Sequence, residues 1–309
     1  YFHTTGTVGC FGSAAAVAAL HEDPAGNVTR HALATAATFA SGLQQAFRSD
    51  AMTKALHAGH AAWVGVTAGC GAADGITGAL DVLEGEAGFG AALSDGADWA
   101  RAVDGLGERY NITAITQKNH GCCGHTFAAI DAMLALRAQH GLSAAQVAAI
   151  AVDTYRTAID VTGNFAPHTA FEAKFSLPYV VAHALLYGAV RLDAFAPARL
   201  ADDGIRALIG RTTLHDDPAL SARFPGMRAA RVRVTLTDGR VLEHFAPYRK
   251  GDPEAPLSDA DINDKFAELA TPVIGTAAAR TLLDRLWSVE RLDVRALGLA
   301  ALPGTVPAG

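Results

Sequence analysis

Runs of small apolar residues fill much of the first hundred positions and have the length of helices. Three of them, TVGCFGSAAAVAAL (7–20), NVTRHALATAATFASGLQQAF (27–47) and HAGHAAWVGVTAGCGAA (57–73), are separated by breakers such as DPAGN. The glycines inside these runs each lower helix propensity by about 1 kcal/mol relative to alanine. Small side chains, however, let helix backbones approach closely. The pattern therefore predicts a compact bundle of helices that depends on packing.

From Ile112 onward the pattern changes to β-branched residues in partial alternation. ITAIT (112–116) and VAAIAVDTY (147–155) predict strands. ARVRVTLTDGRVLEHF (230–245) predicts an antiparallel hairpin, because its two alternating runs meet at Asp-Gly, a dipeptide that accepts the positive φ angles of a tight turn. FEAKFSLPYVVAHALLYG (171–188) and DDGIRALIG (202–210) predict helices between the strands.

After YRKGDPEAPLS the pattern returns to helix. Ser258 stands three residues before Asp261, which predicts a capping box for the helix DADINDKFAELA. A last helix is expected near Ala277–Glu290, and the tail ALPGTVPAG is expected to be disordered.

These patterns predict a mostly helical domain with a smaller α+β lid domain that contains an antiparallel sheet. The expected boundaries are a helical domain over 1–112, the lid over 113–254, a helical return over 255–300 that packs on the first domain, and a disordered tail over 301–309.

Composition limits the classes of ligand. A chain of 309 residues with 50% hydrophobic content can bury roughly three quarters of the surface of its unfolded form, enough for one large or two modest domains. The net charge is −6 and the 25 basic residues are scattered, so neither nucleic acid nor membrane is an expected partner. No apolar run reaches the ~20 residues that span a bilayer. Four cysteines are too few for a disulfide scaffold, which favours a cytoplasmic location.

Three polar clusters stand where apolar helices begin: YFHTTGT at the start, MTKALHAGHAA at Met52–Ala62, and QKNHGCCGH at 117–125. Each sets histidine or lysine beside glycine or small residues, where a ligand can approach a helix N-terminus that favours anions. Histidine exchanges protons near neutrality, and lysine supplies a positive charge. Together they suit proton abstraction next to a carboxylate.

A structural interpretation competes at each cluster. His3 alone is typical of a hydrogen-bonding structural residue, and Lys54 alone of a solvated surface charge. His57 and His60 share one helical face, as a metal pair would, but no HExxH pattern accompanies them.

The segment QKNHGCCGH contains zinc-type ligand atoms. Consecutive cysteines point in different directions, however, and the CxxC spacing of structural zinc sites is absent. No metal site is expected here.

The clusters, taken in order with their spacing, resemble the MmgE/PrpD superfamily. The resemblance covers nearly the whole chain and is carried by seven segments: FHTTGTVGCFGSAAAVAAL, ASGLQQAF, TKALHAGHAAWVG, LEGEAGFGAAL, KNHGCCGHTFAAIDAML, EAKFSLPYVVAHALL and GDPEAPLSDADINDKF. It implies a homodimer of two-domain chains, with a site at the domain junction that uses no cofactor and no metal.

The resemblance also implies site residues. His3 matches the family's histidine after an aromatic residue, Lys54 matches the lysine of a KPLHxG motif, and His125 matches the histidine that opens the first helix of the lid. We expect these three to be catalytic, with His3 or His125 moving the proton and Lys54 holding a substrate carboxylate. The expected substrate-binding residues are His57, Lys174 and Tyr179.

The implied function is that of a metal-independent lyase acting on a small di- or tricarboxylate, similar to 2-methylcitrate dehydratase or to cis-aconitate decarboxylase. Two alternatives stay open: an epimerase of a dicarboxylate such as iminodisuccinate, and a non-catalytic remnant that binds a carboxylate or a partner chain. The second arises because family members carry an upstream helical region with a further active-site histidine. This chain is expected to lack that N-terminal part.

Overall fold

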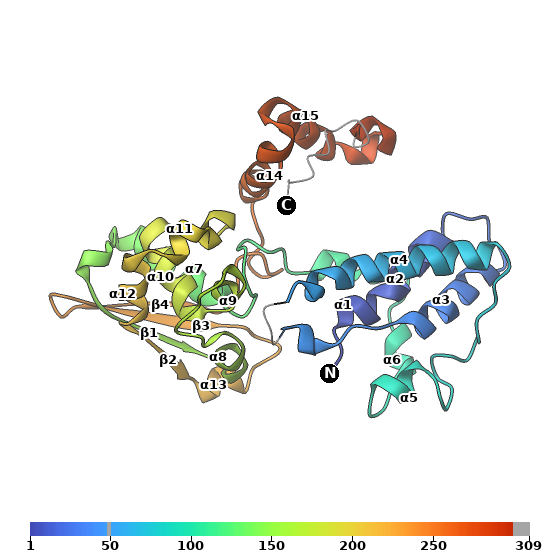
Figure 1. Cartoon of the computed structure of the whole chain (residues 1–309), viewed down its shortest axis with the longest axis horizontal. Coiled ribbons are helices and arrows are strands. Elements are labelled where there is room, and N and C mark those ends of the chain that lie inside the picture. The colour runs from blue at the N-terminus through green and yellow to red at the C-terminus, as the bar shows by residue number, and fades with distance from the viewer. Residues whose placement is uncertain (48–50, 299–309) are drawn as a thin grey trace. The chain divides into compact units, whose positions relative to one another are not determined.

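The computed structural model describes residues 1–47 and 51–298 (Figure 1). Internal contacts divide the chain into an N-terminal unit, Tyr1–Arg109, and a C-terminal unit from Tyr110 onward. The tail at 301–309, expected to be disordered, lies outside the described residues. The prediction of a mostly helical protein with a small sheet is confirmed.

The described part of the N-terminal unit is helical. Its elements are α1 (Thr4–Thr7), α2 (Gly9–Ala18), α3 (Asn27–Phe39), the 3₁₀ helix η1 (Gln44–Phe47), α4 (Thr53–Ala73), α5 (Phe89–Leu93) and α6 (Trp99–Val103). Helices α2, α3 and α4 lie side by side and enclose the core of the unit (Figure 1).

Small residues set how closely these helices approach. A Cβ added at Gly65 would lie 2.2 Å from Cβ of Ser13, and one at Gly69 would lie 2.5 Å from a methyl group of Val17. The backbones of α2 and α4 therefore meet where glycine leaves space. The buried core of the unit consists of Cys10, Ala14, Ala18, Ala32, Ala36, Ala61, Val64, Ala68 and Ala72.

The C-terminal unit contains a sheet and many short helices. Its strands are β1 (Val147–Thr154), β2 (Thr212–Asp216), β3 (Ala230–Leu236) and β4 (Val241–Ala246). Its α-helices are α7 (Phe127–His140), α8 (Arg156–Thr162), α9 (Ala170–Lys174), α10 (Leu177–Tyr187), α11 (Pro197–Leu200), α12 (Asp203–Ile209), α13 (Pro218–Ser221), α14 (Asp259–Ile274) and α15 (Thr276–Leu286). Its 3₁₀ helices are η2 (Asn111–Ala114), η3 (Ala144–Gln146), η4 (Leu192–Phe195), η5 (Val289–Arg291) and η6 (Val294–Leu297).

The sheet has the order β2-β1-β3-β4. β1 pairs in parallel with β2 and antiparallel with β3, and β3 pairs antiparallel with β4. The predicted hairpin is thus confirmed, and Gly239 at its turn has a φ of 88°. Alternation along β3 buries Val232 and Val234 in the core with α7 and α10 and turns Arg231 and Arg233 to the other face.

Two local expectations differ from the structure. The prediction of a strand over 112–116 is wrong: Asn111–Ala114 is a 3₁₀ helix, in which Thr113 donates from both its backbone N–H and its hydroxyl to the carbonyl of Tyr110. Local hydrogen bonds therefore outweigh β propensity, which depends on a partner strand. Strand β2, which the pattern did not suggest, is short and lies at an edge of the sheet.

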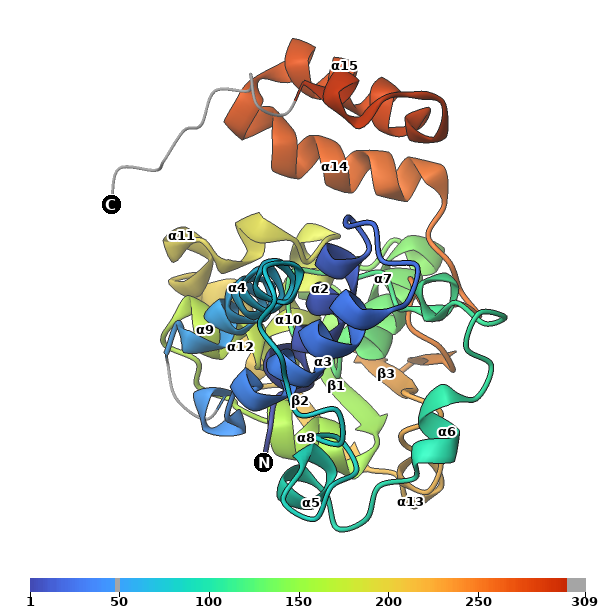
Figure 2. The same ribbon diagram turned by 90° about the vertical axis from the view of Figure 1, so that its right-hand side faces the viewer.

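The C-terminal helices α14 and α15 form an antiparallel pair (Figure 2). The predicted capping box is confirmed: the Ser258 hydroxyl accepts from the backbone N–H of Asp261, whose carboxylate accepts from the backbone N–H of Ser258. Helix α14 also contacts the rest of its own unit, where Lys265 Nζ donates to the carbonyl of Lys118. The expected packing of 255–300 on the helical domain stays a prediction. Across the described residues, no helix is both long and apolar enough to cross a membrane.

Candidate functional site

In the N-terminal unit, His3, Lys54 and His57 come together. The backbone N–H of His3, the residue before α1, donates to the carbonyl of Gly42 at 2.9 Å, which fixes the start of the helix. Lys54 and His57 stand three residues apart in the first turns of α4 and therefore share a face. The two histidine rings meet with Nδ1 of His3 2.7 Å from Nδ1 of His57.

The contact between the two Nδ1 atoms restricts protonation. One ring must donate an Nδ1–H and the other must accept with a lone pair. When both rings are neutral, the donor therefore has a bare Nε2 and the acceptor has an Nε2–H. Burial, followed by the neighbouring His57 and the charge of Lys54, lowers the pKa of His3. With both rings neutral, the pair thus offers one proton acceptor and one proton donor.

His60, the other histidine of α4, belongs to the framework. Its Nε2 lies 3.0 Å from the hydroxyl of Ser41 and 3.2 Å from the carbonyl oxygen of Phe39. These contacts join α4 to the segment after α3. His57 and His60 therefore have different neighbours and do not converge on one point.

In the C-terminal unit, His125 lies just before α7 and is half-buried against aromatic rings. Its Nδ1 is 2.7 Å from the hydroxyl of Tyr155, the residue after β1. The rings of Tyr155 and Phe224 stack with centroids 4.8 Å apart, and the His125 centroid is 6.0 Å from that of Phe224. The end of β1 and the loop before β3 thus hold the imidazole in place.

The environment keeps His125 and Tyr155 uncharged. Burial, followed by the positive charges of Arg228 and Arg249, lowers the pKa of His125 to about 4. Burial also raises the pKa of Tyr155 above its ordinary value. The direction of donation between them decides the chemistry at Nε2: this atom is an acid when the Tyr155 hydroxyl donates, and a base when Nδ1–H of His125 donates.

A buried arginine holds the loop that carries His125. Arg249 binds the carboxylate of Asp252 with two side-chain donors, Nε at 3.0 Å and Nη2 at 2.6 Å, and Nη2 also donates to the hydroxyl of Thr116 at 2.7 Å. A Cβ added at Gly124 would lie 3.2 Å from Nη1 of Arg249. This clamp joins segments far apart in sequence, directly beside His125.

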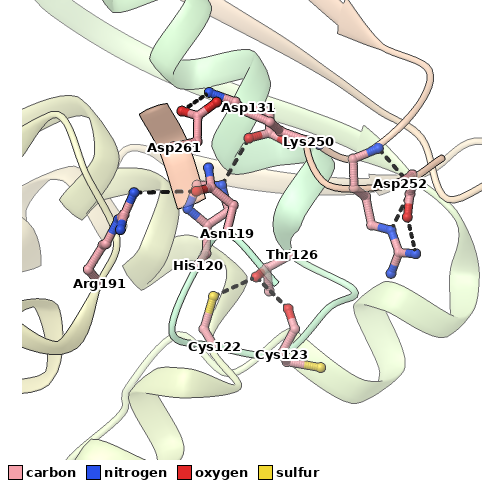
Figure 3. A network of polar contacts seen from close by, with 11 residues as sticks. Asn119, His120, Cys122, Cys123, Thr126, Asp131, Arg191, Lys250, Asp252 and Asp261 are labelled. Atoms are coloured by element: carbon pink, nitrogen blue, oxygen red, sulfur yellow. Dashed lines mark hydrogen bonds and ion pairs between the residues drawn. The ribbon is translucent and has the colours of Figure 1, made fainter. Parts of the chain in front are cut away.

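The crowded segment before His125 is tied to the framework by separate contacts (Figure 3). Nε2 of the buried His120 lies 2.9 Å from the Asp131 carboxylate, which also accepts from the backbone N–H of Lys250 at 2.7 Å. Nζ of Lys250 donates to Asp261 at 2.6 Å, which links this network to α14.

The two cysteines point apart (Figure 3). Sγ of Cys122 is 3.2 Å from the Thr126 hydroxyl, and burial raises the pKa of this thiol to about 12. The backbone N–H of Cys123 donates to the carbonyl of Lys174 at 2.9 Å. No group of three or more histidine, cysteine, aspartate or glutamate side chains is placed to hold a metal ion anywhere in 1–47 or 51–298.

The remaining expected residues, Lys174 and Tyr179, both lie near the ring of Phe195. Nζ of Lys174 lies 5.5 Å from the ring centroid of Phe195, while its carbonyl anchors Cys123. Tyr179 is 2% exposed, and its hydroxyl donates to the carbonyl of Ala194 at 2.7 Å. This hydroxyl is therefore already engaged in holding η4 against α10.

Sequence reasoning missed Tyr155, Arg228 and Arg249 as neighbours of His125. A partial signal exists for Tyr155, a polar aromatic residue at the end of a predicted strand, and for Arg249, which opens the segment RKGDP. Arg228 carries no local signal.

Comparison with known proteins gives two matches to family models. Residues 1–102 match the MmgE/PrpD N-terminal domain, and residues 120–289 match the MmgE/PrpD C-terminal domain.

Curated proteins of known name are similar at low identity. The cis-aconitate decarboxylase-like protein oryM of Aspergillus oryzae is 29% identical over 310 residues, which cover 91% of this chain and 61% of that protein. Human cis-aconitate decarboxylase is 25% identical over 314 residues, covering 99% and 64%. A 2-methylcitrate dehydratase of Cupriavidus necator is 33% identical over 127 residues, covering 38% and 26%. The chain thus spans less than two thirds of the length of these relatives.

Proposed function

The chain belongs to the MmgE/PrpD family, and from this premise we propose that it is a lyase acting on a small di- or tricarboxylate by proton transfer next to a carboxylate. The observation that carries the proposal is the pair of His3 and His57 with the charge of Lys54 beside it. This cluster combines a base, an acid and a cation, which are the groups that such chemistry requires.

Each group has a task in either reaction of the named relatives. Dehydration needs a base that removes a proton from carbon and an acid that protonates the leaving hydroxyl. Decarboxylation needs an acid that supplies a proton to the carbanion that is left when the bond to carbon dioxide breaks. We assign the proton-moving role to His3 or His125. We assign carboxylate binding to Lys54, aided by Lys174 and by His57, whose ring also supplies the second proton site of its pair with His3. Tyr179 we assign to the framework, since its hydroxyl is bound to Ala194.

We also propose that the chain works as a homodimer. The exposed face of α4 is apolar and includes Leu56, Trp63 and Val66, which are 66%, 58% and 53% exposed. Large apolar side chains exposed along one helix are typical of association surfaces. Light scattering on the chain and on a Trp63→Glu variant tests this, and a monomer at all concentrations would contradict it.

The function is tested by proton NMR in deuterated water with 2-methylcitrate, cis-aconitate and iminodisuccinate offered separately. The expected result is net loss of one acid. His3→Ala and His125→Ala should each reduce that loss at least tenfold, because proton transfer by a positioned side chain contributes typically 10²–10⁴-fold. His21→Ala and His140→Ala, which alter exposed histidines of the respective units, are the matched controls.

The other outcomes separate the alternatives. Exchange of a carbon-bound proton for deuterium without a new product would replace the lyase by an epimerase. Tight binding of these acids without any turnover would contradict both enzyme functions and support a carboxylate-binding protein.

A further inference from the structure

Two guanidinium groups lie near His125, and their surroundings differ. Arg249 is buried and neutralised by the carboxylate of Asp252, with which it makes the two-donor contact described above. Its donors are used for structure. Arg228 is only half-buried, and its guanidinium lies near the ring of Phe224.

The backbone of Arg228 is fixed beside the end of β1. Its neighbours in sequence, Met227 and Ala229, are buried in the small core that contains Tyr155. The carbonyl of Ala229 accepts from the hydroxyl of Thr154 at 2.9 Å. Arg228 is therefore carried by an ordered segment, directly next to the partner of His125.

The guanidinium of Arg228 shares an aromatic neighbour with His125. Its Cζ lies 5.7 Å from the ring centroid of Phe224, the ring that stacks on Tyr155 and lies 6.0 Å from His125. A cation over an aromatic face is held there while its N–H donors stay available. The charge of Arg228 lowers the pKa of both His125 and Tyr155. At His125 it acts together with burial, and at Tyr155 it opposes burial.

No carboxylate of the described residues neutralises this charge. Within 1–47 and 51–298, the ion pairs and side-chain hydrogen bonds include none made by the Arg228 guanidinium. Arg233 in β3 provides a contrast, since its Nη2 pairs with the carboxylate of Asp153 at 2.9 Å. The surroundings of His125 thus contain one cation balanced within the protein, Arg249, and one that is not, Arg228.

We propose that Arg228 binds a carboxylate group of the substrate beside His125, so that the C-terminal unit has an anion-binding subsite of its own. This inference rests on the proposed function for the identity of the ligand. A guanidinium presents paired donors that match both oxygens of a carboxylate. An acid held in this way presents its neighbouring carbon to the imidazole. Arg228 is then a substrate-binding residue that favours acids with an additional carboxylate for it to bind.

The subsite is tested by calorimetric titration of the full chain with citrate and with succinate. Arg228→Gln should weaken citrate binding at least tenfold, and Arg228→Lys should weaken it less, because lysine keeps the charge and loses the paired donors. Arg223→Gln is the matched control, since Arg223 lies exposed in the same loop and should leave affinity unchanged. Melting temperatures of all variants check that the fold is retained, and Arg228→Lys serves if the glutamine variant does not fold.

A second readout locates the ligand. Citrate should shift the ring resonances of His125 in the wild-type chain and in Arg223→Gln, but not in Arg228→Gln. Equal affinities of wild type and the Arg228 variants would overturn the subsite, as would absence of citrate and succinate binding to the wild-type chain.

The subsite and the lyase can fail separately. Arg228-dependent citrate binding without turnover of any offered acid would support the subsite and contradict the lyase. Turnover whose KM is unchanged by Arg228→Gln would support the lyase and overturn the subsite.

Discussion

At the scale of single residues, the protonation of His125 sets a pH dependence. The folded chain lowers its pKa to about 4, through burial first and then through Arg228 and Arg249, while an unfolded chain titrates near 6.5. Between about pH 6.5 and 4 the unfolded state therefore binds a proton that the folded state does not. The free energy of unfolding should fall as the pH falls through this window.

Urea unfolding at pH 7 and pH 4.5 measures this effect. His125→Asn removes the titrating group, so this variant should lose less stability on acidification than the wild-type chain. His140→Asn, which changes an exposed histidine, should behave as wild type. Parallel losses in all three proteins would show that His125 titrates normally.

The C-terminal unit contains two buried, hydrogen-bonded tyrosine hydroxyls that can be compared, those of Tyr155 and Tyr179. Tyr155→Phe and Tyr179→Phe each remove one buried hydroxyl, bound to His125 in the first case and to the Ala194 carbonyl in the second. Each substitution should cost about 1–3 kcal/mol of stability, because a buried partner loses its hydrogen bond. Only Tyr155→Phe should also lower turnover severalfold, since it alone frees the His125 imidazole. Equal effects on kcat would remove Tyr155 from the site.

At the scale of elements, the approach of α2 to α4 depends on glycine at particular positions. A Cβ at Gly65 would lie 2.2 Å from Cβ and 2.5 Å from the carbonyl carbon of Ser13, whereas one at Gly59 would meet nothing within 4 Å. Gly65→Ala should therefore destabilise the chain by about 1–3 kcal/mol. Gly59→Ala, in the same helix, should stabilise it by about 0.5–1 kcal/mol. Thermal unfolding distinguishes them, and a stabilising Gly65→Ala would contradict the close backbone contact.

Elements were predictable where their signals are local. The Asp238-Gly239 turn and the Ser258 capping box each lie within a few residues of the structure that they specify, and both predictions are confirmed. The segment 112–116 misled because β-branched residues form a strand only with a partner, and here the Tyr110 carbonyl accepts locally instead. Strand β2 gave no clear signal because five residues at a sheet edge show little alternation.

At the scale of the whole molecule, the candidate site was only partly accessible from sequence. The resemblance to a family pointed to His3, Lys54 and His125 as single residues. It did not reveal that His57 pairs with His3 across 54 positions, or that Tyr155 hydrogen-bonds to His125 across 30 positions. Such contacts depend on tertiary packing, and no periodicity or spacing encodes them.

The two units also differ in the size of the apolar side chains that they bury. The N-terminal core is built from alanine, one valine and one cysteine, whereas the C-terminal core contains large side chains such as Phe127, Ile130 and Met133. The heat capacity change of unfolding follows the apolar area exposed, at about 0.45 cal/mol/K per Å². The N-terminal unit should therefore fall below the usual ~12–15 cal/mol/K per residue. Its stability curve should be flatter than that of the C-terminal unit, so that cooling weakens it less.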